Sequence, residues 1–128
     1  MTTGSTAATI SGDKLFRDHI ARFNAGVDSG DFGPTIDAFS DDAVFTFEGR
    51  SLGPLRGRAE IAAGSREYPA TDWIEVISTT EPDESTVVAR FRWVRASDTG
   101  TITMQHRGDV LTAITVTFDG TSGPEVHP

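Results

Sequence analysis

The chain has 128 residues, which is the size of a single domain and leaves no room for two. Its 11 Lys+Arg against 19 Asp+Glu give a formal net charge of −8, which argues against nucleic acid or a membrane surface as a partner. The absence of cysteine excludes disulfides, thiolate metal sites and a cysteine nucleophile. No apolar run approaches the roughly 18 residues of a membrane span, and no signal-peptide pattern opens the sequence, so we expect a cytoplasmic protein.

Both ends of the sequence are rich in small and polar residues that cannot anchor themselves to a core. We therefore expect a disordered arm over residues 1–10, one domain over residues 11–118 and a flexible tail over residues 119–128.

Helical signals come first along the chain. A helix is expected over residues 12–29, with Ser11 as its N-cap and Gly30 at its C-terminal end. Its apolar stripe has helical spacing and consists of Phe16, Ile20, Phe23 and Val27. A short second helix begins at Pro34, includes Ile36 and Phe39 on its apolar side, and is broken by the Ser-Asp-Asp sequence of residues 40–42. A third is predicted over Arg58–Tyr68, because the residue before Pro69 avoids the helical region.

Strand signals dominate the rest of the chain. Alternation over residues 43–48 predicts a strand, and residues 49–57 read as a loop. Four further strands are predicted at residues 73–80, 86–95, 101–106 and 110–118. Their short connections imply antiparallel neighbours. In the last strand, strict alternation puts Leu111 on the face opposite to Ile114 and Val116.

Several short motifs occur together in a fixed order: Phe23-Asn-Ala-Gly, Gly30-Asp-Phe32, Phe39-Ser-Asp-Asp-Ala-Val44 and Gly57-Arg-Ala-Glu-Ile61. This arrangement resembles the NTF2-like superfamily and, within it, the SnoaL-like group. The resemblance implies an α+β cone in which three N-terminal helices pack on a curved antiparallel sheet around an apolar pocket. It also implies a homodimer formed through the outer face of the sheet.

The same resemblance allows the catalytic residues of one activity to be compared with the residues of this sequence. Ketosteroid isomerases of this fold use a tyrosine and two aspartates, whose positions correspond to Phe23, Phe47 and Ile102 here. Because all three are apolar, isomerisation by that route is not expected. The arginines of residues 90–95 are predicted to face outward while Phe91 and Trp93 face the core.

Two histidines could carry protons in the pocket. His19 lies on the edge of the first apolar stripe, either as a general acid or base or as a residue at the boundary between core and solvent. His106 shares a strand face with Ile102, and both a catalytic and a structural role stay open for it. Asp41 and Asp42 are interpreted as a turn, since no group of residues has metal-ligand spacing.

Two functions therefore remain open. One is an enzyme that needs no cofactor or metal, a cyclase, dehydratase or isomerase using His106 and His19. The other is a non-catalytic domain that binds a small ligand. In either case the expected ligand is apolar or polycyclic, because aromatic walls suit flat apolar molecules. The residues predicted to line its site are Phe23, Phe45, Phe47, Tyr68, Trp73, Trp93, Ile102 and Met104.

Overall fold

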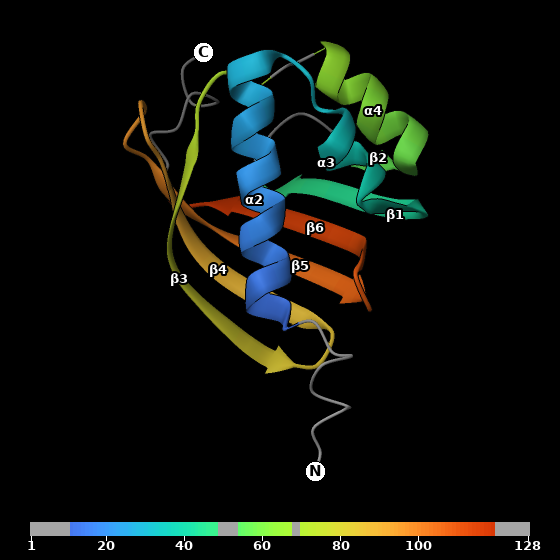
Figure 1. The fold of residues 1–128 in the computed structure, drawn as a ribbon. Helices are drawn as coiled ribbons and strands as arrows, with labels where there is room; N and C mark the ends of the chain where they lie inside the picture. Colours follow the sequence, from blue (N-terminus) through green and yellow to red (C-terminus); the bar gives the residue numbers. More distant parts are fainter. Residues whose placement is uncertain (1–10, 49–53, 68–69, 120–128) are drawn as a thin grey trace.

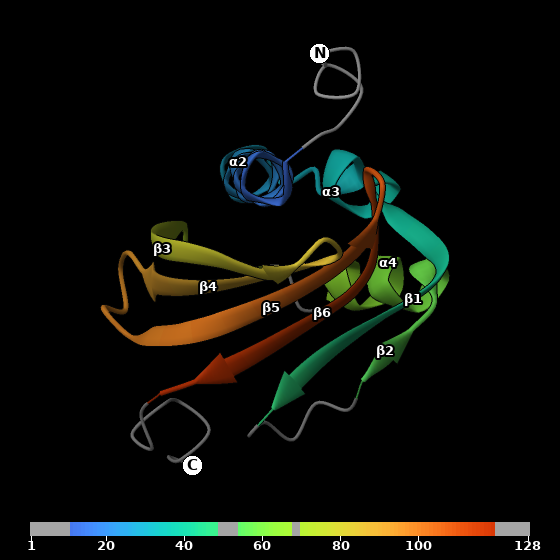
Figure 2. The ribbon, with the colours of Figure 1, turned by 90° about the horizontal axis from the view of Figure 1, so that it is seen from below.

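The structure, a computed structural model, describes residues 11–48, 54–67 and 70–119. Over these residues the order of elements is α2 (Gly12–Ser29), α3 (Gly33–Asp37), β1 (Phe39–Glu48), β2 (Leu55–Arg56), α4 (Arg58–Glu67), β3 (Ile74–Asp83), β4 (Thr86–Trp93), β5 (Thr99–Arg107) and β6 (Val110–Phe118). The strands form one curved sheet in the order β2-β1-β6-β5-β4-β3 (Figures 1 and 2). The predicted α+β class with three helices is confirmed. In the described part of the chain, no helix combines the length and the apolarity that a membrane crossing requires.

Helix α2 begins and ends where the sequence predicts. The Ser11 hydroxyl accepts a hydrogen bond from the Lys14 N–H at 3.1 Å, and Gly30 closes the helix in a left-handed conformation at φ 82°. The buried face of the helix contains Leu15, Phe16 and Ile20 and packs on β3 and β4 (Figure 2). Helix α3 lies between α2 and α4, and α4 packs on β1 and β2.

Strands β3 to β6 are antiparallel neighbours, as their short connections predict. Strand β1, however, runs parallel to β6, so the expectation of a wholly antiparallel sheet is wrong. The rule on short connections says nothing about this pair, because a helix and four strands separate β1 from β6 along the chain.

The prediction that residues 40–42 end the second helix is also wrong. Helix α3 stops at Asp37, and the Ser-Asp-Asp sequence belongs to an irregular start of β1. Phe39 pairs with Leu111 and Val44 pairs with Ala113, so four residues of β1 bulge opposite one residue of β6. Arg58 stabilises this bulge by contacting the Asp41 carboxylate and the Phe39 carbonyl oxygen.

One smaller expectation is corrected next to α4, and the predicted end of this helix stays a prediction. The predicted loop of residues 49–57 contains strand β2, which pairs with β1 through Leu55 and Arg56. Helix α4 ends at Glu67, and the predicted last residue, Tyr68, lies outside the described residues together with Pro69.

A bulge also changes which side chains of β6 point towards the core. His106 pairs with Leu111 whereas Gln105 pairs with Ala113, so Thr112 is an extra residue in β6. An extra residue reverses the alternation of side chains beyond it. Leu111 is therefore fully buried and faces the same side as Ile114, contrary to the strict alternation expected.

The core lies between the concave face of the sheet and the helices. Its largest fully buried side chains are Phe16, Phe39, Phe91, Met104, Leu111 and Val87. The β4 arginines lie on the opposite face, as predicted. Arg92 pairs with Glu75, and Arg90 pairs with Asp119, a residue that the sequence places in the tail.

Candidate functional site

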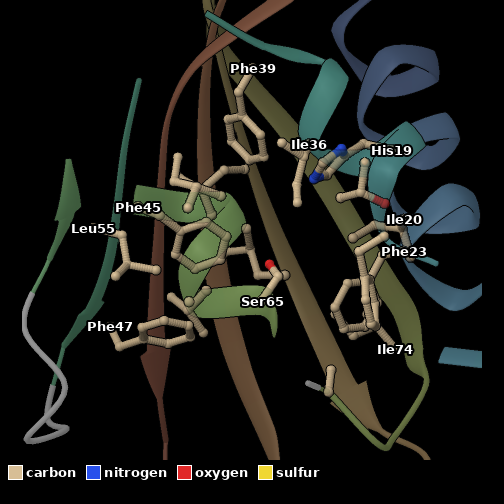
Figure 3. Close-up of a pocket in the computed structure, with 18 of the residues that line it drawn as sticks. His19, Ile20, Phe23, Ile36, Phe39, Phe45, Phe47, Leu55, Ser65 and Ile74 are labelled. Carbon is tan, nitrogen blue, oxygen red and sulfur yellow. The ribbon is translucent and has the colours of Figure 1, made fainter. Parts of the chain in front are cut away.

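A pocket of about 210 Å³ opens between the helices and the concave face of the sheet. Most of its lining is aromatic or aliphatic, and no aspartate, glutamate, lysine or arginine is among the described lining residues. Figure 3 shows Phe39, Phe45 and Phe47 of β1 on one side, and His19, Ile20 and Phe23 of α2 on the other. The aromatic residues of the lining are Phe16, Phe23, Phe32, Phe39, Phe45, Phe47, Phe91 and Trp93.

The aromatic rings contact one another in two chains. Along β1 and its start, the ring centres of Phe39 and Phe45 lie 6.2 Å apart, and those of Phe45 and Phe47 lie 4.8 Å apart. On the other side, Phe23 lies 5.8 Å from Phe32 and 6.2 Å from Trp93. These tilted arrangements lock the rings against one another and give the pocket preformed aromatic walls.

Two local features hold the end of α2 against the pocket. Gly26 is buried, and a Cβ atom at this position would lie 2.6 Å from Phe32 Cδ1, so the glycine allows the Phe32 ring to pack on the helix. The Asn24 amide donates to the Ile74 carbonyl oxygen at 2.9 Å and accepts from the Ile74 N–H at 2.8 Å. This paired bond fixes the start of β3 beside α2.

His19 is the titratable side chain among the described lining residues. Its side chain is buried, with the residue only 5% exposed, and its ring meets Phe39 edge-on with centres 5.5 Å apart. Burial lowers the pKa of His19 to about 4, and the positive charge of Arg22 contributes in the same direction. The imidazole is consequently neutral at neutral pH, and its Nδ1 has no hydrogen-bond partner within the described residues.

Thr35 and Ser65 are the other polar lining residues, and sequence reasoning missed both. Thr35 is 8% exposed, and its Oγ1 likewise finds no partner in the part of the chain that is described. Ser65 follows Ile61 by four residues on α4, so helical spacing could have placed it on the inner face. For Thr35, in a helix of only five residues, the sequence carries no comparable signal.

Several predicted site residues do come together. The pocket lining includes His19, Phe23, Phe45, Phe47, Trp93 and Ile102. Among them are Phe23, Phe47 and Ile102, the positions at which the resemblance implies the tyrosine and the two aspartates of ketosteroid isomerases. Here these positions supply two phenyl rings and one aliphatic side chain to the same cavity.

The structure does not bring His106 and Met104 to the pocket, although both are buried on the concave side. Met104 lies opposite Val87 on β4, and a Val87 methyl carbon would be 2.8 Å from a Cβ at Gly12. The start of α2 therefore packs directly on this part of the sheet and fills the space. The His106 Nδ1 lies 2.9 Å from the Gly108 carbonyl oxygen, so this side chain is bonded within its own hairpin.

Trp73 is not among the lining residues either. Its Nε1–H donates to Asp28 at 2.8 Å, and the Arg95 guanidinium lies 4.3 Å from the ring centre, so Trp73 connects α2 to the strand ends. Tyr68 lies outside the described residues. Within the described ranges, no group of three or more histidine and carboxylate side chains could hold a metal ion.

The helices and the curved sheet enclose an apolar cavity in an arrangement that is the NTF2-like fold. The sequence matches the SnoaL-like domain over residues 16–123, and the chain therefore belongs to the SnoaL-like family. No curated protein shows significant sequence similarity to it.

Solved structures share the fold at low sequence identity. An NTF2-like protein from Anabaena variabilis is similar with a TM-score of 0.65 and 21% identity, covering 94% of this chain and 95% of that one. A provisionally named ketosteroid isomerase from Kribbella flavida has a TM-score of 0.65 and 12% identity, and the match covers 87% of this chain and 82% of that one. A provisionally named polyketide cyclase from Sinorhizobium meliloti has a TM-score of 0.59 and 17% identity, and the match covers 77% of this chain and 93% of that one. These likenesses establish the architecture, which hosts several activities.

Proposed function

We propose that this SnoaL-like protein binds a small apolar molecule in the pocket between α2 and β1. The observation that carries the proposal is the composition of the described lining, in which the polar side chains are those of His19, Thr35 and Ser65. An apolar ligand would exchange water for these walls, and each buried CH₂ group contributes about 0.8 kcal/mol. Walls of interlocked rings lose little freedom on binding, which lowers the cost of association.

The size of the cavity narrows the class of ligand. An apolar cavity of roughly 150 Å³ can hold benzene, whereas sites for drug-sized ligands are about 300–1,000 Å³. A cavity of about 210 Å³ lies between these values. We therefore propose a ligand with one or two rings, which is narrower than the apolar or polycyclic class expected from the sequence.

A second candidate function is catalysis without a cofactor, as a cyclase, dehydratase or isomerase. The neutral imidazole of His19 favours it, because this group faces the cavity and could accept a proton. A base with a pKa of about 4 is deprotonated at neutral pH but is a weak proton acceptor, since general bases work best with pKa values near the operating pH. Binding is consequently the function that the site supports better.

Intrinsic fluorescence tests binding directly. Because Trp93 lines the pocket and Trp73 does not, the variant Trp73→Phe leaves a single tryptophan at the site. Titration with one- and two-ring compounds should change Trp93 emission in a saturable way. Ser65→Leu should abolish this response by filling the cavity, while Ala63→Leu, on the exposed face of the same helix, should not. A response that survives Ser65→Leu unchanged would contradict the proposed site.

Turnover separates the two candidate functions. We expect no ketosteroid isomerisation, since Phe23, Phe47 and Ile102 supply neither a base nor an acidic hydroxyl. For any ring compound that is converted, His19→Leu should remove the activity and His106→Ala should leave it. The opposite pattern would return the proton carrier to His106.

A homodimer remains a prediction. The outer face of the central strands carries half-buried Val44, Val88 and Ala113 among threonines, and the described helices lie on the other face. A second copy of the chain would cover these side chains. Light scattering should give about 27 kDa, twice the 13.7 kDa of one chain, and about 14 kDa at micromolar concentration would contradict the dimer.

A further inference from the structure

Two residues that line the pocket each have a buried polar atom without a partner. The His19 Nδ1 on α2 and the Thr35 Oγ1 on α3 belong to residues that are more than nine-tenths buried, and both residues line the cavity. Within the described residues, neither atom has a hydrogen-bond partner. Arg22 Nε is the third such atom, but Arg22 is not a lining residue.

Leaving these atoms unpaired is costly. A buried donor or acceptor without a partner loses its hydrogen bonds to water and gains none in return, and native proteins rarely keep one without a reason. An apolar replacement of the same shape, such as valine for Thr35, would avoid the cost. Two such atoms, on residues of two helices that line one apolar cavity, therefore indicate a polar group that the protein itself does not supply.

The missing group has to be uncharged. No described lining residue carries a charged side chain, so a carboxylate or an ammonium group would lose its hydration without gaining a counter-ion. The charged side chain that influences His19 is Arg22 on the same helix, whose positive charge lowers the pKa of the imidazole. A hydroxyl group both donates and accepts, so it can bond the Thr35 hydroxyl and either tautomer of the His19 ring.

We propose that His19 and Thr35 together recognise a single neutral hydrogen-bonding group, a hydroxyl or carbonyl, on an otherwise apolar ligand of one or two rings. This inference rests on the proposed function and deepens it. The polar group of the ligand would lie against α2 and α3, while its rings would face the aromatic wall of β1, which lies opposite His19 in Figure 3. The pair thereby orients the ligand as well as selecting it.

Matched probes test the inference by calorimetry. The two-ring compounds 2-naphthol, naphthalene and 2-naphthoate share one frame and carry a hydroxyl, no polar group and a negative charge. We expect 2-naphthol to bind about tenfold more tightly than naphthalene, which corresponds to about 1.4 kcal/mol, and 2-naphthoate not to bind.

Three variants locate the effect. Thr35→Val and His19→Leu should each bring the ratio of the two affinities close to one, without weakening the binding of naphthalene. Thr103→Val makes the same chemical change on the outer face of β5 and should leave the ratio unchanged. Because the ratio compares two ligands in one variant, a change in cavity shape affects both ligands and cancels. Thr35→Val carries the test by itself if His19→Leu does not fold.

The outcomes distinguish a failure of this inference from a failure of the proposed function. If both neutral probes bind equally well and Thr35→Val changes nothing, the apolar pocket stands and the polar recognition is wrong. Preferred binding of 2-naphthoate would overturn the neutral-group inference in favour of an anion site. If no probe binds to the wild-type protein, the proposed function fails together with this inference.

Discussion

The two buried histidines, His19 and His106, belong to regions of the core that are built differently. Near His106, the start of α2 packs closely on β4, where a Cβ at Gly12 would lie 2.8 Å from a Val87 methyl carbon, and Met104, Val87 and Leu111 are fully buried. The ring of His106 is bonded to the Gly108 carbonyl oxygen, and its backbone N–H donates to the Ser85 carbonyl oxygen at 2.9 Å. This region is tightly packed, and His106 is hydrogen-bonded through its Nδ1 and its backbone N–H.

In the region of His19, by contrast, aromatic rings lie between α2 and β1. Phe23, Phe45 and Phe47 are only partly buried because they face a cavity, and His19 lies beside them with its Nδ1 unpaired. Burial alone therefore does not tell which of the two histidines lines the cavity. The two differ in exposure by only two percentage points, 5% against 7%, and what separates them is the partner of the ring nitrogen.

The largest expected effect sharpens the contrast between filled and open regions. Met104→Ala should lower the free energy of unfolding by about 2–5 kcal/mol, because it creates a cavity in fully packed surroundings. Phe47→Ala should cost about half as much, since Phe47 already faces empty space. Urea unfolding of both variants measures the difference. Equal losses would contradict the distinction between the two regions.

The next effect comes from the charge of His19. Its pKa of about 4 in the folded protein lies below the ordinary value of 6.5, so the unfolded chain binds more protons between these values. Stability from this group is complete above pH 6.5 and is lost as the pH falls, by about 3 kcal/mol at pH 4. Urea unfolding of wild type and His19→Leu from pH 7 to pH 4 should show this loss in wild type alone, beyond changes common to both. Parallel pH profiles would mean that His19 is hydrated.

A smaller effect, opposite in sign, is expected at Thr35. In the absence of ligand, Thr35→Val should raise the free energy of unfolding by about 1 kcal/mol, because it removes an unpaired buried hydroxyl. Thr103→Val, on the outer face of β5, is the control and should change stability little. A loss of stability in Thr35→Val would indicate that the hydroxyl has a partner in solution.

The smallest effect is expected on the outer face. Hydrogen bonds from Arg90 and then Thr99 lower the pKa of Asp119 to about 2, so their stabilisation is present above pH 4 and is lost as the pH falls through 2. The Arg90 and Asp119 side chains are 43% and 41% exposed, so solvent screens the pair and Asp119→Asn should cost less than about 1 kcal/mol. Thermal unfolding at low and high salt measures this, and a larger or salt-independent loss would contradict an exposed pair.

Local features of the sequence determined much of the fold. The limits of α2 follow from Ser11, Gly30 and the apolar stripe between them, because capping and helical period act within a few residues. The same holds for the outward arginines of β4, whose alternation with Phe91 and Trp93 fixes their face. The resemblance to the SnoaL-like group added the order of the elements and the convergence of Phe23, Phe47 and Ile102.

Only the tertiary structure decided which histidine meets the cavity. In the sequence, His19 and His106 each lie beside the apolar residues of one face of their element. The difference between them arises because α2 contacts the sheet at Gly12 and Val87 and leaves a cavity further along. The parallel pairing of β1 with β6 likewise depends on residues far apart in the chain. Local patterns set faces and element limits because their interactions are short in sequence. Cavities and strand partners arise from long-range packing, which no local window contains.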